Sequence, residues 1–318
     1  IVKVMNKKIL IIMDPIESIN IKKDTTYQLM LSAQEYGHEL YYMVPGSLSI
    51  NSCEPVGSIS RIKLHKEKKI FYEKLEVNKI QLSKFDYILM RLDPPVNNNY
   101  IYITYILDMV KNKNIKVLNT GSSLRNYNEK LIALNFPNHI PDTVLTCSKN
   151  ELSLFKKKHK KIILKPLNLM GGKSIYLIDE SDKNFNVITE DMTCSWKNYI
   201  IAQEYLPDAS EGDKRIIVIN GEVIEESVIR VPNNNDHRAN LASGGSIKKY
   251  NLTQEEVKIC KEVAKFLFEK NIFLAGIDMI GNKITEVNIT SPTCLAEIND
   301  FHNIDLGKRF WEAVNELD

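Results

Sequence analysis

The sequence is poor in several features that would place a chain in a specialised class of protein. Its five cysteines are widely spaced and form no CxxC pair; they are Cys53, Cys147, Cys194, Cys260 and Cys294. This pattern argues against a zinc site or a disulfide framework and favours the reduced thiols of a cytoplasmic protein. The formal charge is only +2, and no apolar run approaches the ~20 residues of a membrane-spanning helix. We therefore expect neither a nucleic acid held mainly through its phosphates nor a membrane as a partner.

Arginine is also scarce, since seven of the 42 basic residues are arginines and the other 35 are lysines. In such a chain an arginine is more often present for its planar guanidinium group, which binds carboxylates and phosphates through paired hydrogen bonds. The remaining composition is that of an ordinary globular protein, with 43% hydrophobic and 26% charged residues. Its 318 residues predict about two domains. The run Ile9–Met13 is too short for a signal peptide, and we expect Met5 to be the translational start.

The first third of the chain alternates strands with helices. Apolar runs predict strands at 7–13, 39–44, 87–91 and 115–118, and helices are predicted at 25–36 and 100–111. Asp24 suits the N-cap of the first helix and Gly37 suits its C-terminal end. We expect residues 1–122 to form an α/β domain around a mostly parallel sheet, in which 45–83 are irregular.

From about residue 121 the pattern changes to that of an α+β unit over 123–318. Helices are predicted at 123–136, 152–159 and 255–270, and strands at 161–165, 199–204, 215–219, 222–230, 273–280 and 284–290. Capping boxes are predicted from Ser148 with Glu151 and from Thr253 with Glu256. Ser291-Pro292 predicts the start of a last helix.

The last predicted hairpin carries three oxygen-bearing side chains. Asp278 is on its first strand, and Glu286 and Asn288 lie two residues apart on its second strand, so they share a face. Two carboxylates and an amide suit Mg²⁺, which proteins bind together with substrate phosphates; the alternative is a solvent-facing side of an amphipathic strand. A two-residue turn at Gly281-Asn282 would put Asp278 on the opposite face. We therefore predict a connection of odd length with a bulge, which brings all three oxygens into one cleft.

Two further segments have the composition of a nucleotide site. In Ile162–Ser174 an apolar strand ends near Lys165 and is followed by Gly171-Gly172, which can surround phosphates with an ammonium group and backbone N–H groups. An exposed hairpin turn is an equally good interpretation of this segment alone. In Gln203–Pro207 a strand end runs into a loop beside apolar side chains, as in an adenine site, although a buried edge strand is the better interpretation of this segment alone.

Arginines and acidic residues gather in three more regions. Asp213–Arg215, Arg230 and His237–Gly245 supply guanidinium groups and a glycine-flanked loop, which suit carboxylates and a transferred phosphoryl group. Met13–Thr26 and Leu89–Pro95 follow predicted parallel strands, at the edge where open α/β sheets bind ligands.

Together and in this order, these segments resemble the bacterial glutathione synthetase family of the ATP-grasp superfamily. The resemblance rests on MDPI, INIKKD, DPP, TYIL, NEK, ILKPL, MGG, YLP, GDKR and TSPTC, and it covers about 7–316. It implies an ATP-grasp fold for 123–318, with 136–205 as the smaller nucleotide-clamping part, behind the substrate-binding N-terminal domain. It also implies ATP-dependent ligation of γ-glutamylcysteine to glycine through an acyl phosphate.

The resemblance also implies roles for individual residues. It implies ATP contacts from Lys130, Lys165, Gly171, Gly172, Gln203, Glu204, Tyr205, Leu206 and Asp213. It implies that Mg²⁺, as two ions that Mn²⁺ can replace, binds Asp278, Glu286 and Asn288. It implies substrate contacts from Lys23, Arg91, Arg230, Asn240, Ser291, Thr293 and Glu297, and catalytic roles for Arg215 and Arg238. A homo-oligomer, specifically a tetramer, is implied as well.

A few positions depart from the usual sequence of the family. Asn168-Leu169 stands in place of Asp-Gly, Leu92 in place of lysine, Ala239 in place of glycine, and Ala296 in place of a frequent arginine. They leave two alternatives open: a ligase for another peptide-like acid and amine, and a nucleotide-binding module without turnover.

Overall fold

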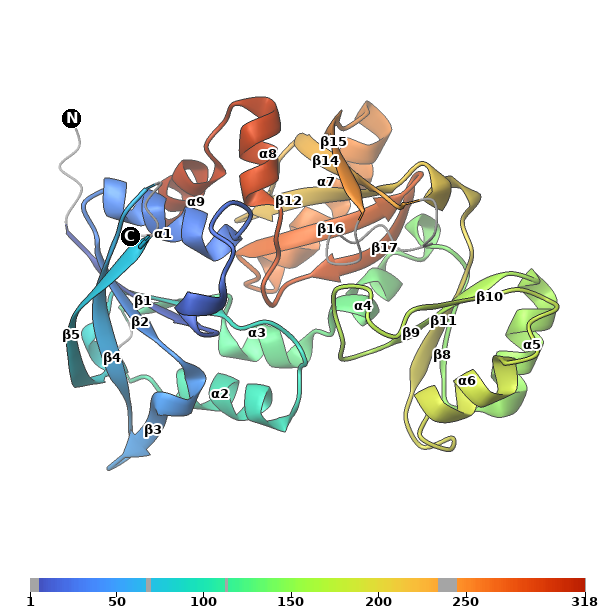
Figure 1. Cartoon of the computed structure of the whole chain (residues 1–318), viewed down its shortest axis with the longest axis horizontal. Helices are drawn as coiled ribbons and strands as arrows, with labels where there is room; N and C mark the ends of the chain where they lie inside the picture. Colours follow the sequence, from blue (N-terminus) through green and yellow to red (C-terminus); the bar gives the residue numbers. More distant parts are fainter. Residues whose placement is uncertain (1–5, 67–69, 112–113, 234–244, 318) are drawn as a thin grey trace.

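The computed structural model describes residues 6–66, 70–111, 114–233 and 245–317, which form three β-sheets surrounded by helices (Figure 1). The N-terminal sheet has the order β3-β4-β2-β1-β6-β7. Strand β4 also pairs with β5, which lies outside this order. Its strands are β1 (Lys8–Met13), β2 (Glu39–Met43), β3 (Leu48–Asn51), β4 (Glu54–Leu64), β5 (Tyr72–Gln81), β6 (Tyr87–Arg91) and β7 (Lys116–Leu118).

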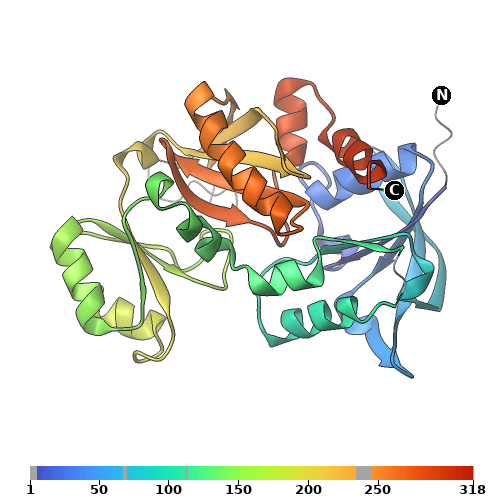
Figure 2. The same ribbon diagram turned by 180° about the vertical axis from the view of Figure 1, so that it is seen from behind.

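The centre of this sheet is parallel, because β1 pairs in parallel with both β2 and β6, and β6 with β7. Helices cover both of its faces, so the continuous apolar run of β1 is buried on both sides (Figures 1 and 2). One face carries α1 (Thr25–Glu35), α8 (Leu295–His302) and α9 (Leu306–Asn315), and the other carries α2 (Asn98–Asp108) and α3 (Gly121–Asn126). The α/β arrangement predicted for this region is confirmed, but the sheet is mixed instead of mostly parallel, because β4 pairs antiparallel with β2, β3 and β5.

A second, four-stranded sheet is antiparallel with the order β10-β9-β11-β8. It consists of β8 (Thr143–Thr146), β9 (Ile162–Pro166), β10 (Tyr176–Ile178) and β11 (Ile200–Glu204). Two helices, α5 (Lys149–His159) and α6 (Phe185–Met192), pack on one face and share a separate apolar core with the sheet. This part lies at the right of Figure 1.

The third sheet has the order β15-β14-β12-β16-β17, with β13 beside β12. It consists of β12 (Asp213–Ile219), β13 (Glu222–Val223), β14 (Glu226–Val231), β15 (Ser246–Asn251), β16 (Leu274–Ile280) and β17 (Lys283–Asn288). Two more helices, α7 (Gln254–Glu269) and α4 (Glu129–Ile132), lie beside it. Short 3-10 turns occupy η1 (Ile16–Ser18), η2 (Pro45–Ser47), η3 (Leu82–Lys84), η4 (Ala133–Asn135), η5 (Pro137–His139) and η6 (Pro207–Ser210).

The helix caps at Asp24 and Thr253 are present as predicted, but the capping box predicted at Ser148 is incomplete, because its N–H donates to Thr146 Oγ1 instead of Glu151. The Asp24 carboxylate accepts a hydrogen bond from the backbone N–H of Tyr27 at 2.7 Å, and Gly37 follows the helix with φ of +84°. At the start of α7, Thr253 and Glu256 form the reciprocal capping box. These side chains satisfy N–H groups that have no partner within the helix.

The prediction that 45–83 are irregular is wrong, because this segment forms β3, β4 and β5. Strand β5 exposes almost every side chain, and β4 is interrupted by a register shift between Arg61 and Ile62. Neither strand therefore shows the strict apolar–polar alternation that identifies a half-buried strand in a sequence.

Two predicted helices also differ. The helix predicted over 123–136 is broken, because the Asn128 side chain accepts the N–H of Lys130 at 3.0 Å and starts a new helix, α4. Ser291-Pro292 lies in a loop instead of starting a helix, since the carbonyl of Pro292 accepts from Arg91 and α8 begins at Leu295. No helix among the described residues is long and apolar enough to cross a membrane.

Candidate active site

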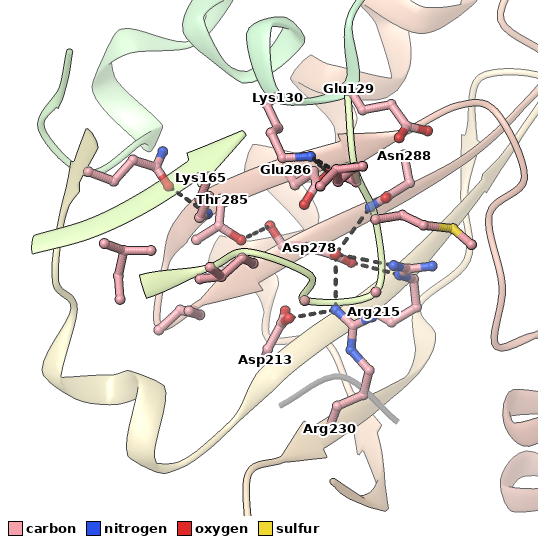
Figure 3. Close-up of a pocket in the computed structure, with 18 of the residues that line it drawn as sticks. Glu129, Lys130, Lys165, Asp213, Arg215, Arg230, Asp278, Thr285, Glu286 and Asn288 are labelled. Atoms are coloured by element: carbon pink, nitrogen blue, oxygen red, sulfur yellow. Dashed lines mark hydrogen bonds and ion pairs between the residues drawn. The ribbon is translucent and has the colours of Figure 1, made fainter. Parts of the chain in front are cut away.

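A cavity of about 280 Å³ lies between the second and third sheets, beside the loop that follows β9 (Figure 3). Most of the residues predicted from the sequence line it: Lys130, Lys165, Gly171, Gly172, Gln203, Glu204, Tyr205, Leu206, Asp213, Arg215, Arg230, Asp278, Glu286, Asn288, Ser291 and Thr293. They come from both sheets, from α4 and from two loops. The fold therefore brings together segments that are up to 160 residues apart in the chain.

The connection between β16 and β17 is not of odd length as predicted. It is a two-residue turn, Gly281-Asn282, that pairs Ile280 with Lys283. The extra residue lies further along the ladder, at Thr285, where the register shifts by one position. The predicted bulge is therefore present, but inside the strands.

This shift places Asp278 opposite Glu286 and Gly276 opposite Asn288. Figure 3 shows the three oxygen-bearing side chains pointing into the cavity from neighbouring positions. The Asn288 amide donates to Oδ2 of Asp278 at 3.1 Å, which fixes the two side chains relative to each other.

Two arginines neutralise Asp278. Arg215 donates to both of its oxygens, at 2.6 and 3.1 Å, and Arg230 lies 3.0 Å from Oδ2. Burial opposes the ionisation of Asp278, but these two guanidinium groups outweigh it and lower the pKa of the carboxyl to about 2. A Cβ atom at Gly276 would lie 3.1 Å from Cδ of Arg215, so glycine leaves room for this arrangement.

Asp213 shares Arg230 with Asp278. Arg230 Nη2 donates a hydrogen bond to Asp213 Oδ2 at 2.6 Å. Burial raises the pKa of Asp213 to about 7; the charge of Asp278 adds to the rise, while Arg230 opposes it. The other carboxylate oxygen of Asp213 and Nε of Arg230 are buried without a partner among the described residues. A ligand in the cavity can supply those missing hydrogen bonds.

Two lysines lie on another wall of the cavity. Lys130 donates to Glu286 at 3.0 Å and to the carbonyl of Leu169 at 2.8 Å. Lys165 donates to the neutral Oε1 of Gln203 at 2.7 Å. Burial lowers the pKa of Lys165, and the charge of Glu286 opposes that shift.

The predicted adenine segment borders the same cavity. Glu204 and Tyr205 donate their backbone N–H groups to the carbonyls of Asp142 and Lys161. The Lys161 ammonium lies 3.9 Å from the centre of the Tyr205 ring, which holds that ring in place.

Three predicted residues in the described part of the chain, Lys23, Arg91 and Glu297, do not line the cavity. Arg91 is buried behind it and donates to Pro292 O at 2.9 Å and to Thr26 Oγ1 at 3.1 Å. Burial raises the pKa of Glu297, and the charge of the Lys23 ammonium opposes this rise. Oε2 of Glu297 is buried and has no hydrogen-bond partner among the described residues. The remaining two, Arg238 and Asn240, lie outside the described residues.

Comparison with known proteins identifies the family. Residues 7–125 match the N-terminal domain of prokaryotic glutathione synthetase, and residues 129–303 match its ATP-grasp domain. The glutathione synthetases of Vibrio parahaemolyticus and Escherichia coli O157:H7 are each 40% identical to this chain over 307 residues. Those residues are 96% of this chain and 97% and 98% of the two relatives. The chain belongs to the prokaryotic glutathione synthetase family.

Solved structures of other ATP-grasp proteins share the fold. D-cycloserine synthetase DcsG aligns with a TM-score of 0.67 and 11% identity, over 97% of this chain and 99% of that chain. The ATP-grasp ligase PsnB, complexed with a minimal precursor, Mg and ADP, aligns with a TM-score of 0.61 and 15% identity over 97% of each chain. The ATP-grasp fold predicted from the sequence is confirmed, and this member of the glutathione synthetase family is an ATP-dependent carboxylate–amine ligase.

Glu129 also lines the cavity and was not predicted from the sequence. Its Oε1 accepts from the N–H groups of Ile289 and Thr290 and from the Thr290 hydroxyl, at 2.7 to 2.9 Å. Burial raises its pKa, and the charge of Glu286 adds to the rise. The NEK motif that drew attention to Lys130 contains Glu129, but its contacts depend on how α4 packs against the end of β17.

The residues present fit a magnesium–nucleotide complex. Among the described residues, no group of three or more His, Cys, Asp or Glu side chains could hold a metal. Asp278, Glu286 and Asn288 instead offer two carboxylates and one amide, so a hard cation would complete its shell with phosphate oxygens and water.

Proposed function

We propose that this chain ligates γ-glutamylcysteine to glycine, with formation of glutathione, ADP and phosphate. The observation that carries the proposal is the cavity face of β16 and β17, where Asp278, Glu286 and Asn288 converge beside Lys130 and Lys165. A carboxylate does not react with an amine at neutral pH because its leaving group would be oxide. Phosphorylation converts it to an acyl phosphate, whose leaving group is phosphate. The site must therefore gather anions, neutralise them and exclude water.

Asp278, Glu286 and Asn288 would hold magnesium, and we propose two ions that Mn²⁺ can replace. When bound, the metal neutralises phosphate charge and polarises the phosphoryl group that is transferred. Lys130 and Lys165 would hold the phosphates. Arg215 and Arg238 would stabilise the charge that develops on the phosphoryl group and on the tetrahedral intermediate. Catalysis then rests on positioning and electrostatics, without a covalent enzyme nucleophile.

The nucleoside would lie at the other end of the cavity. Because the N–H groups of Glu204 and Tyr205 are already engaged, Leu206 N–H is the donor that this segment would offer to adenine. The unpartnered oxygen of Asp213 would accept a hydrogen bond from a ribose hydroxyl. Gln203 would hold Lys165, and Gly171 and Gly172 would let the loop after β9 approach the phosphates.

The acid and amine substrates would lie toward the N-terminal sheet. We propose that these substrates contact Lys23, Arg91, Arg230, Asn240, Ser291, Thr293 and Glu297. Arg91 would also position this wall, because its bond to Pro292 O fixes the loop between Ser291 and Thr293. We propose further that 1–122 form the substrate-binding domain and 123–318 the ATP-grasp domain, with 136–205 as its clamping part, in a cytoplasmic homotetramer.

Phosphate release from Mg-ATP, measured with a panel of dipeptides and amines, tests the proposal. Release that requires both γ-glutamylcysteine and glycine would support it. Release with a different acid and amine would favour another ligase, and ATP binding without release would favour a module without turnover. Two departures from the family, Leu92 and Ala296, are 5% and 3% exposed and do not line the cavity, so they do not favour either alternative.

A further inference from the structure

The root of the loop after β9 is held firmly to the rest of the molecule. The backbone carbonyls of three consecutive residues, 167–169, each accept a hydrogen bond from outside the second sheet. The donors are Asn128 Nδ2 at 2.9 Å, Val96 N at 3.3 Å and Lys130 Nζ at 2.8 Å. Residues 168–169 are also where this chain departs from the usual Asp-Gly of its family. The pinned root fixes the direction in which the following residues enter the cavity.

The tip of the same loop turns tightly. Gly171, Gly172 and Ser174 have φ of +65°, +76° and +55°, and Lys173 N–H donates to Met170 O at 3.2 Å. The root of the loop lies beside one of the oxygen ligands, because the Lys130 ammonium donates to both Leu169 O and Glu286. Lys173 lines the cavity together with Asp278 and Glu286. The tip therefore carries a lysine in the cavity that the oxygen ligands line.

The other cations that line the cavity are already engaged. Lys130 is paired with Glu286, Arg215 with Asp278, and Arg230 with Asp213 and Asp278, while Lys165 binds the neutral Gln203 amide. Lys173 is exposed, and its ammonium has no ion-pair or hydrogen-bond partner among the described residues. An anionic ligand can contact Lys173 without breaking an ion pair.

We propose that Lys173 is a third phosphate-binding lysine, whose ammonium contacts the terminal phosphate oxygens of the bound nucleotide. The inference rests on the proposed function, because it takes ATP as the ligand of the cavity. The terminal phosphates are the favoured partner, since Lys173 lines the same cavity as Asp278, Glu286 and Asn288, and Lys130 joins the root of its loop to Glu286. Lys173 adds a positive charge where phosphoryl transfer would begin.

The test measures the affinity of the full-length chain for ATP, ADP and AMP, with Mg²⁺ in excess, by calorimetry. Three variants are compared with the natural sequence: Lys173→Gln, Lys173→Arg and the control Lys157→Gln. Lys157 is an exposed lysine of α5 that does not line the cavity. We expect Lys173→Gln to weaken ATP binding about fivefold, with a smaller effect on ADP and none on AMP. Lys173→Arg should restore ATP affinity, and Lys157→Gln should change nothing.

The series separates failure of this inference from failure of the proposed function. If the natural chain binds ATP and Lys173→Gln binds it equally well, the inference is wrong. Equal losses for ATP and AMP would also refute it, because they would place Lys173 away from the terminal phosphates. A natural chain that binds none of the three nucleotides would overturn the proposed function and this inference with it.

Discussion

Asp278 and Glu286 lie opposite each other in the hairpin, yet they balance different amounts of buried charge. Asp278 is 5% exposed and neutralises two guanidinium groups, those of Arg215 and Arg230. Replacing it by asparagine leaves Arg215 buried without a compensating carboxylate and leaves Arg230 with Asp213 alone. Removal of one partner from a buried ion pair costs about 3–5 kcal/mol. We expect Asp278→Asn to lower the free energy of unfolding of the nucleotide-free protein by about that amount.

Glu286→Gln is the matched comparison. Glu286 has one ionic partner, Lys130 at 3.0 Å, and its side chain is 17% exposed. A glutamine oxygen at this position can still accept the hydrogen bond from Lys130, and the repulsion between Glu286 and the buried Glu129 disappears. We expect a loss of about 1 kcal/mol or less. Both variants should lose ligase turnover, since each removes a proposed metal ligand.

Thermal unfolding without nucleotide or metal, at pH 7, distinguishes the two. A loss of 3–5 kcal/mol corresponds to a fall in melting temperature of roughly 4–8 °C for a chain of this size. Glu286→Gln should stay within about 2 °C of the natural protein. Equal melting temperatures for the two variants, or a larger fall for Glu286→Gln, would refute the reasoning that Asp278 balances more buried charge than Glu286 does.

Three further predictions concern single side chains. Arg238→Lys should lose far more turnover than ATP affinity, because lysine cannot make the paired planar contact; unchanged kcat would contradict this. Cys294→Ala should keep substantial ligase activity, since burial raises the pKa of the Cys294 thiol and the acyl-phosphate route needs no nucleophile; a trapped thioester would contradict this. The pKa of Asp213 rises from its ordinary value near 4 to about 7 on folding, so its contribution to stability is fully present below pH 4 and is lost as pH rises through 7. Asp213→Asn should therefore gain stability relative to the natural protein as the pH is raised from 5 to 8, and parallel pH curves would disprove this.

Local sequence signals predicted much of the fold. The apolar run of β1 and the caps at Asp24 and Thr253 depend on neighbouring residues, and all three are present in the structure. Strand β5 was not predictable in this way, because its side chains are mostly exposed and it is held by its backbone pairing with β4. Glu129 was missed for a similar reason, since its role depends on contacts with residues 160 positions away.

The β16–β17 hairpin marks the boundary between what the sequence could and could not predict. The need for one extra residue followed from chemistry, because a regular ladder after a two-residue turn would separate Asp278 from Glu286 across the sheet. Its place did not follow, since an extra residue in the turn and one inside the strand restore the same pairing. Thr285 is that residue: its hydroxyl donates to the carbonyl of Asp278 at 3.3 Å, and it lines the cavity next to Glu286. Gly281-Asn282 can thus keep the compact turn that its composition favours, while the bulge sets the register of the proposed metal ligands.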